Sequence, residues 1–322
     1  MSELLRVNEL KKYFSTPRGE LHAVDNVTFG IEEGSTLGVV GESGCGKSTL
    51  GRTILRMHEP TSGEIIYKGE VINDKSQREL KLLRREMQMI FQDPYESLDP
   101  RMSISTIIAE PLVCNHIYKN SADVNKKVLE LMDTVGIARR LENSYPHELD
   151  GGRRQRVGIA RALAMEPKFI VCDEPVSALD VSIQAQVLNL LQDLQRDQKL
   201  TYLFITHNLS VVRHIATRIC VMYLGQVVEL ADKKDLFDHT YHPYTQALPS
   251  AIPIPSTLNR RQRIILQGEL TSPIEPKPGC RFASRCRYAQ PACFSENPTL
   301  RDMGNGHMVA CHFAGKLEES KE

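Results

Sequence analysis

The sequence contains no long apolar run, no excess of charge of either sign and no internal repeat. No stretch of its 322 residues is long and apolar enough to span a bilayer, and residues 1–6 lack the apolar core of a signal peptide. Lysine plus arginine equals aspartate plus glutamate, at 40 each, so no overall field favours nucleic acid or an anionic membrane. We therefore expect a cytoplasmic protein that binds no nucleic acid and meets a membrane only through a partner.

A glycine-rich stretch fits the pattern G-x-x-x-x-G-K-[ST], which binds nucleotide phosphates. An apolar strand is predicted at residues 36–40 before it and a helix at 48–57 after it, as the motif requires. The glycines let successive backbone N–H groups point at phosphate oxygens. Lys47 is placed to bind the β- and γ-phosphates and Ser48 to hold Mg²⁺. The predicted nucleotide-binding residues of this loop are Gly41, Glu42, Ser43, Gly44, Cys45, Gly46, Lys47, Ser48 and Thr49.

Apolar strands alternate with helices along much of the chain. Residues 4–31 have the short, partly alternating runs of β structure, and residues 92–141 have a helical pattern. The alternation predicts an α/β fold with a parallel sheet covered on both faces, whose ligands lie at the carboxyl ends of the strands. The predicted strands are 87–91, 169–172 and 202–205, and the predicted helices are 76–85, 151–165 and 182–195.

Polar residues follow three of these strands. Asp173 and Glu174 end one of them, where Asp173 suits a Mg²⁺ ion and Glu174 suits the polarisation of the attacking water. Gln92 ends another strand, and its amide is placed to sense both Mg²⁺ and this water. His207 follows the third, within reach of a γ-phosphate. Together with the phosphate loop, they predict an ATP-hydrolysing site.

The stretch from Tyr145 to Arg156 resembles the signature of ATP-binding-cassette (ABC) proteins, whose usual form is Leu-Ser-Gly-Gly-Gln before a helix. Gln92 resembles the Q-loop glutamine of this family, and His207 resembles its switch histidine. The residues that match the signature are Leu149, Asp150, Gly151, Gly152 and Arg153, and those that resemble the D-loop are Ser177, Ala178, Leu179 and Asp180.

The resemblance covers residues 1 to about 240 and implies the fold. We expect a P-loop NTPase-like ABC ATPase domain at 1–251, with a mixed sheet core, an antiparallel β subdomain and a helical signature subdomain at about 92–165. A proline-rich connector at 252–279 and a four-cysteine extension at 280–322 complete the predicted organisation.

The closer resemblance is to ATPase subunits of dipeptide and oligopeptide importers, on the stretches 38–49, 91–101 and 242–245. It implies two transmembrane permease subunits, an extracytoplasmic solute-binding protein and a place at the cytoplasmic face of the membrane. Nickel, opines and oligosaccharides use similar subunits, so the solute stays open. A soluble cassette acting on ribosomes or DNA fits less well, because the chain has one cassette and no room for a long coiled coil.

Two such domains pair head to tail in this family, each ATP lying between one phosphate loop and the partner's signature. The resemblance implies that positions 93–111 form the groove for the permease's coupling helix. It also implies that Tyr13 or Phe14 stacks on adenine. Only one can do so, because adjacent strand residues face opposite sides, and we favour Phe14.

The signature departs from the family pattern at two positions. Asp150 replaces serine and Arg153 replaces glutamine. Aspartate caps a helix well, but its carboxylate would face a γ-phosphate across the dimer. Arg153, one turn on, is placed to neutralise it in part. The nucleotide site that this signature completes is thus predicted to be impaired, which favours a heterodimer with a paralogous ATPase over a homodimer.

Four of the eight cysteines crowd into the last part of the chain. Cys280, Cys286, Cys293 and Cys311 have the spacing C-x₅-C-x₆-C-x₁₇-C, which differs from the paired C-x₂-C of zinc ribbons. In a reducing compartment, this spacing indicates a metal before disulfides. The resemblance implies a 4Fe–4S cluster. Zinc is the alternative, with His307 or His312 as a substitute ligand.

Overall fold

A computed structural model describes residues 2–250, 264, 266, 268 and 272–316. The chain forms two compact units. The first consists mainly of Asp74–Ile205, and the second of Glu3–Ile31, Thr36–Asn73 and the chain from Thr206 onward. Most of the connector predicted at 252–279 lies outside the described residues. Among the described residues, no helix combines the length and apolar character needed to cross a bilayer.

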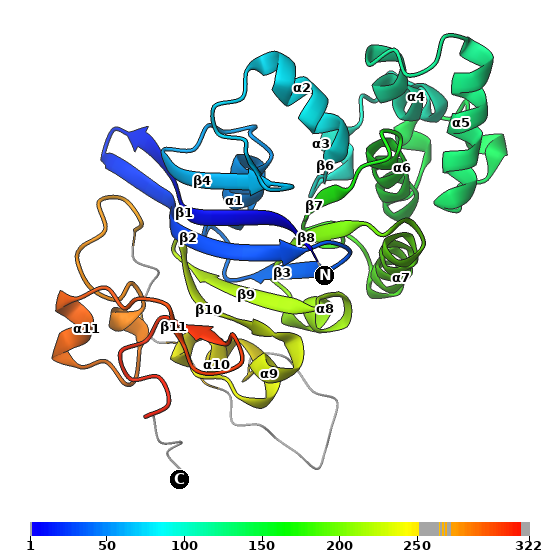
Figure 1. The fold of residues 1–322 in the computed structure, drawn as a ribbon. Helices are drawn as coiled ribbons and strands as arrows, with labels where there is room; N and C mark the ends of the chain where they lie inside the picture. Colours follow the sequence, from blue (N-terminus) through cyan, green and yellow to red (C-terminus); the bar gives the residue numbers. More distant parts are fainter. Residues whose placement is uncertain (1, 251–263, 265, 267, 269–271, 317–322) are drawn as a thin grey trace, which may run out of the picture. The chain divides into compact units, whose positions relative to one another are not determined.

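The first unit contains three parallel strands. Residue Met87 pairs with Phe169, and Asp173 pairs with Ile205, as predicted for neighbouring parallel strands. All five residues of the middle strand are buried, because the strand is continuously apolar until its last residue. The strands, in sheet order, are β8 (Thr201–Thr206), β7 (Phe169–Asp173) and β6 (Met87–Ile90) (Figure 1).

The helices of the first unit agree closely with the sequence pattern. The stretch predicted as helical at 92–141 contains three α-helices and a 3₁₀ turn. In one of them, the apolar side chains at helical spacing, including Val128 and Met132, are buried. The helices are α2 (Gln77–Glu86), α3 (Pro94–Ser97), α4 (Ile104–Cys114), α5 (Ser121–Thr134), α6 (Gly151–Leu163) and α7 (Val181–Gln198), with 3₁₀ turns at Arg139–Leu141 and Pro146–Glu148.

One sheet of the second unit is antiparallel and contains the N-terminal strands. Residues 17 and 18 form the turn between two strands of 14 residues each, which are longer than the short runs expected from the sequence. Leu5 pairs with Tyr67 and Val7 with Ile65, and all four side chains are buried. In sheet order, the strands are β2 (Gly19–Glu32), β1 (Glu3–Thr16), β4 (Ser62–Tyr67) and β5 (Glu70–Val71).

The other strands of the second unit join the phosphate-loop strand to the C-terminal segment. Strand β3 (Thr36–Val40) is parallel to β9 (Arg218–Tyr223), and β10 (Gln226–Asp232) is antiparallel to it, so the predicted mixed sheet is confirmed. Glu229 of β10 pairs in turn with Val309. The remaining elements are α1 (Lys47–Ile54), α8 (Leu209–Ile215), α9 (Lys233–Asp238), α10 (Pro243–Ser250), a 3₁₀ turn (Ala283–Arg285), α11 (Pro291–Ser295), β11 (Arg301–Asp302) and β12 (Met308–Val309).

Candidate nucleotide-binding site

The predicted phosphate loop lies in the second unit, between the buried strand β3 and helix α1. Gly46 has φ 100°, and a Cβ at this position would lie 1.9 Å from the carbonyl oxygen of Ala23. A side chain is therefore excluded at Gly46 by both conformation and space. Gly44 has φ 78° but open space around it. The loop thus adopts a backbone that only glycines accommodate at these positions.

Lys47 directs its ammonium group into the loop. Its Nζ donates to the carbonyl oxygens of Gly41 at 2.8 Å and Glu42 at 2.9 Å, and the residue is only 4% exposed. Ser48 follows in the first turn of α1, whose N-terminus carries the positive end of the helix dipole. The loop, the lysine and the helix end together form an anion-binding arrangement.

In the first unit, Gln92 and Glu174 come together at the ends of neighbouring strands. The Gln92 amide donates to the Glu174 carboxylate at 3.1 Å, and Asp173 is fully buried beside it. Glu174 has φ 45°, which is uncommon for a residue with a side chain, and its N–H donates to Ile205 at 2.9 Å. The two side chains predicted to orient and activate a water are therefore in contact.

The D-loop forms a hydrogen bond with the backbone of Glu174. The hydroxyl of Ser177 donates to the Glu174 carbonyl at 3.0 Å, and Ser177, Ala178 and Asp180 are exposed. Leu179 lies against the signature, because a Cβ on Gly151 would be 3.2 Å from its side chain. The D-loop thus lies between the predicted catalytic carboxylate and the signature.

The signature begins helix α6. The Asp150 side chain accepts from the Arg153 N–H at 2.8 Å, and the Arg153 guanidinium lies 3.3 Å from the carboxylate. The predicted helix cap and the predicted contact between Arg153 and Asp150 are both present, and the partial neutralisation stays a prediction. A Cβ on Gly152 would lie 2.5 Å from Ile183, so this glycine is required for close packing against α7. Leu149, which precedes the cap, is buried.

His207 directly follows β8 and is exposed. It belongs to the second unit, as does the phosphate loop, whereas Gln92, Asp173 and Glu174 belong to the first. That these two groups act around one nucleotide stays a prediction.

The candidate adenine-stacking residues differ in their surroundings. Tyr13 stacks on His22 with ring centroids 3.8 Å apart, and its hydroxyl donates to Asp25. Phe14 meets His58 edge-on at 5.6 Å. His22 covers one face of Tyr13, and Lys12 Nζ lies 4.7 Å from the centre of the Phe14 ring, so the choice of Phe14 stays a prediction.

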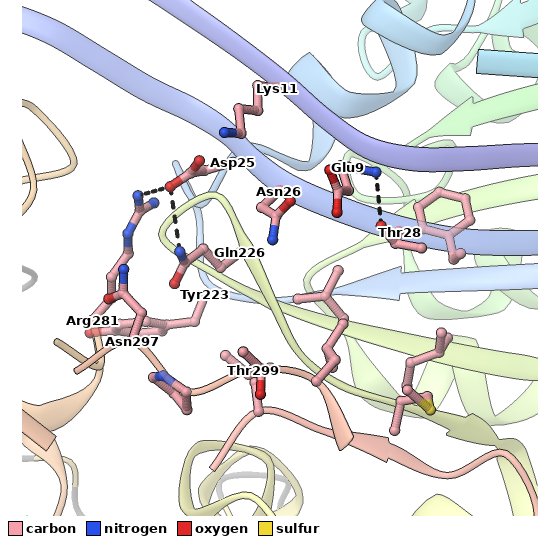
Figure 2. A pocket seen from close by; sticks show the side chains of 18 of the residues that line it. Glu9, Lys11, Asp25, Asn26, Thr28, Tyr223, Gln226, Arg281, Asn297 and Thr299 are labelled. Atoms are coloured by element: carbon pink, nitrogen blue, oxygen red, sulfur yellow. Dashed lines mark hydrogen bonds and ion pairs between the residues drawn. The ribbon is translucent and has the colours of Figure 1, made fainter. Parts of the chain in front are cut away.

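An ion pair that the sequence does not reveal joins the C-terminal segment to β2. Figure 2 shows Arg281 directed at Asp25, on the wall of an open cavity of about 750 Å³, with Gln226 donating to the same carboxylate at 3.4 Å. Burial alone would raise the pKa of Asp25, but the hydrogen bond from Tyr13 and the charge of Arg281 outweigh it and lower this pKa. No sequence pattern links positions 25 and 281.

The four C-terminal cysteines line one small cavity of about 20 Å³. Burial raises the pKa of the Cys280 thiol to about 11. In the described part of the chain, no group of three or more histidine, cysteine or acidic side chains is arranged to hold a metal ion. The structure therefore does not support the predicted metal-binding character of the extension, because the ligands do not form a ready-made set. The four cysteines are Cys280, Cys286, Cys293 and Cys311.

Of the two histidines proposed as substitute zinc ligands, His307 is engaged elsewhere, whereas His312 lines the same cavity as the cysteines. His307 has one ring nitrogen 2.8 Å from Glu229 and the other 2.8 Å from Asp235. Nε2 of His312 lies 2.9 Å from the Glu296 carbonyl oxygen. His307 is thus a bridge between two carboxylates, and neither ring nitrogen remains for a metal.

Residues 24–177 match the ABC transporter family, and residues 228–293 match the C-terminal region of oligopeptide/dipeptide transporters. The oligopeptide transport ATP-binding protein AppF of Bacillus subtilis is 49% identical, over 96% of this chain and 97% of that protein. The oligopeptide transport ATP-binding protein OppF of Escherichia coli is 50% identical, over 95% and 92%.

Solved structures of ATP-binding cassettes resemble the fold. The post-hydrolysis dimer of the cassette MJ0796, bound to ADP and Pi, has a TM-score of 0.65 and 29% identity, covering 71% of this chain and 99% of that one. The cbiO1 protein of Clostridium perfringens, part of an ABC transporter complex, has a TM-score of 0.66 and 28% identity, covering 74% and 92%.

The fold and the phosphate loop define a P-loop ATPase of the ABC class, for which ATP and Mg²⁺ are the expected ligands. Within this class, the chain belongs to the ATP-binding proteins of the oligopeptide transporter family.

Proposed function

We propose that this chain hydrolyses ATP to drive the uptake of dipeptides and oligopeptides through two transmembrane permease subunits, with an extracytoplasmic solute-binding protein delivering the peptide. Peptides are favoured as the solute because residues 228–293 match the C-terminal region of oligopeptide/dipeptide transporters. The chain then works at the cytoplasmic face of the membrane, held there by the permease subunits. Within it, 1–251 is the ATP-binding domain, 252–279 a connector and 280–322 an extension.

In this proposal, the two groups of site residues act on one nucleotide. Lys47 and the loop N–H groups bind the phosphates, and Phe14 stacks on the base. Ser48, Gln92 and Asp173 would hold Mg²⁺, which would neutralise phosphate charge. Glu174 accepts a proton from the attacking water, which is oriented by Gln92, and His207 contacts the γ-phosphate. The contact between Gln92 and Glu174 supports this division of roles.

The groove at 93–111 would receive the coupling helix of the permease. The Arg154 guanidinium lies 3.6 Å from the centre of the Tyr95 ring, and the Arg161 guanidinium donates to the Ser97 carbonyl at 2.6 Å. Both arginines belong to α6, the helix that begins at the signature. These two contacts support a mechanical link between the coupling-helix groove and the signature, because both are joined to helix α6.

The solute is tested with the assembled transporter in proteoliposomes. Polypeptides that co-purify with this chain are first sequenced. Peptide-loaded binding protein should then stimulate ATP hydrolysis and peptide uptake. Stimulation by nickel, an opine or an oligosaccharide in place of peptide would overturn the choice of solute. Co-purification with ribosomes or DNA, and with no membrane protein, would overturn the transport function itself.

We also propose that the chain pairs with a paralogous ATPase that retains a normal signature. Such a pair has one fully equipped site, made of this chain's phosphate loop and the paralogue's signature. Lys47→Ala should therefore reduce transport far more than the equivalent change in the paralogue. Loss of one charge-assisted phosphate contact costs on the order of 1.5–3 kcal/mol, enough to lower occupancy at least tenfold. Equal impairment of the two variants would contradict the heterodimer.

The four cysteines are proposed to hold a 4Fe–4S cluster. Support comes from the lining of one small cavity by all four cysteines, although they form no ready-made ligand set there. A single zinc ion would need all four sulfurs about 2.3 Å from one point, whereas a cluster distributes them over several iron atoms. Protein prepared without oxygen should contain iron and sulfide and absorb visible light. Cys280→Ser should lose both, and Cys114→Ser, on an exposed cysteine, should keep them. Stoichiometric zinc without iron would decide for the alternative.

A further inference from the structure

Arg285, in the C-terminal segment, forms an ion pair with Glu42 of the phosphate loop. Arg285 donates from Nη1 to the Glu42 carboxylate at 2.8 Å and from Nη2 to its other oxygen at 3.2 Å. This bidentate pair is among the strongest hydrogen-bonded ion pairs in proteins. The Arg285 side chain is 9% exposed and that of Glu42 is 26% exposed, so solvent screens the pair only in part.

Glu42 is the second residue of the loop, and it is fixed on three sides. Its N–H donates to the Tyr244 hydroxyl at 2.8 Å, and its carbonyl accepts from Lys47 Nζ at 2.9 Å. Its side chain is held by Arg285. The position of the Glu42 carbonyl therefore determines one of the contacts of Lys47, the residue that binds phosphate.

The groups that hold Glu42 form one packed cluster. Tyr223 lies 4.8 Å from Tyr244 and 5.2 Å from Phe282, between ring centroids, and Phe282 is buried. The Tyr223 hydroxyl also lies 3.3 Å from the Arg285 guanidinium. Since Phe282 and Arg285 lie between Cys280 and Cys286, the first half of the four-cysteine segment is built into this cluster.

We propose that Arg285 is a positioning residue for the phosphate loop, which it holds through Glu42 in the geometry that binds ATP. The C-terminal segment is then a structural part of the nucleotide site. This inference rests on the ATP site proposed above. It assigns to Arg285 no contact with nucleotide, and its effect passes through Glu42 and Lys47.

Replacement of Arg285 tests the proposal in the assembled transporter. Arg285→Met should raise the KM for ATP about tenfold, which corresponds to about 1.4 kcal/mol, and leave kcat at saturating ATP close to the wild-type value. Arg285→Lys should restore part of the affinity, because it keeps the charge and loses the bidentate geometry. Arg301→Met is the matched control, since Arg301 donates to carbonyl oxygens of Cys311 and His312 in the same extension and has no bond to the loop.

Glu42→Gln removes the charge of the other partner in the ion pair, which is the more exposed of the two. This variant tests the proposal even if Arg285→Met does not fold. It should raise the KM for ATP by a similar factor, and the double variant should be no worse than either single one. An unchanged KM in folded Arg285→Met or in Glu42→Gln, or an equal rise in Arg301→Met, would overturn the positioning role. A wild-type complex that fails to bind ATP would instead overturn the proposed function.

Discussion

The Gln92 amide donates a hydrogen bond to the Glu174 carboxylate over 3.1 Å. The two residues follow strands β6 and β7, which are parallel neighbours with Ile90 opposite Cys172. Two polar residues that lie 82 positions apart in the sequence thus meet at one end of a sheet. This is where ligands of parallel sheets bind.

Glu174→Gln should retain ATP binding and lower turnover by at least 100-fold, because an amide does not accept a proton from water as a carboxylate does. Steady-state hydrolysis and nucleotide binding in the assembled transporter measure the two effects. Glu166→Gln is the matched control, since Glu166 is exposed and forms an ion pair with the partly buried Lys127. Near-normal turnover in Glu174→Gln would refute the assignment.

Asp150→Ser should preserve the stability of the chain and raise the activity of the site that its signature completes. Serine caps a helix about as well as aspartate, and it removes the carboxylate that repels phosphate. Asp150→Ala should instead lose about 1 kcal/mol, because the Arg153 N–H loses its acceptor. Urea denaturation and ATPase assays compare the variants. An Asp150→Ser variant with unchanged activity would show that the carboxylate is tolerated.

Gly46→Ala should abolish ATP binding, whereas Gly44→Ala should weaken stability only by about 1–2 kcal/mol. Both glycines have positive φ, but a Cβ on Gly46 would collide with the backbone of Ala23 while one on Gly44 meets open space. Binding of a fluorescent ATP analogue, combined with thermal unfolding, separates the two cases. Equal behaviour of the two variants would mean that the contact with Ala23 is not limiting.

His307 should make the stability of the chain depend on pH. Burial alone would lower the pKa of His307, but its bonds to Glu229 and Asp235 outweigh burial and raise it. The stabilisation from the charged His307 is therefore fully present below its unfolded pKa of about 6.5. It is lost as the pH rises through the higher pKa that His307 has in the folded protein. The N–H groups of Tyr241 and His242 also face Glu229, but they do not titrate in this range.

The free energy of unfolding, measured in urea between pH 6 and 9, should therefore fall with pH in the wild-type protein. His307→Gln should flatten this part of the profile and lower stability at pH 6. His239→Gln, on an exposed histidine, is the control and should leave the profile unchanged. A wild-type slope that survives in His307→Gln would exclude the bridge as its cause.

Local patterns predicted much of the first unit and the phosphate loop. The continuous apolar residues of β7 and β8 predicted buried parallel strands, and Asp150 before Gly151-Gly152 predicted a helix start. These features depend on residues close in sequence, so one chain suffices to reveal them. The two zinc-ligand candidates His307 and His312 could not be judged in this way, because their partners lie elsewhere in the chain.

The sequence pattern did not predict the hairpin formed by β9 and β10, because its turn lacks the residues typical of such turns. Its two-residue turn has Leu224 at φ 43° and Gly225 at φ 84°, where such turns usually have asparagine or aspartate before the glycine. Contacts between the loop and the extension were missed because Glu42 and Arg285 are separated by 243 positions. Neither residue type nor spacing signals a pair at that separation.

The pairing of β12 with β10 covers part of a strand edge that could otherwise pair with another chain. Strand β10 is buried along most of its length, and its backbone groups at Glu229 and Leu230 would lose their partners if the segment carrying β12 were removed. With that segment in place, the edge strand next to β12 is β11, which has two residues, the oppositely charged and exposed Arg301 and Asp302. So short and charged an edge is a poor template for another strand. In a chain cut before Gly279, β10 would therefore replace the short, charged β11 as the edge strand and would be more prone to pair with another chain.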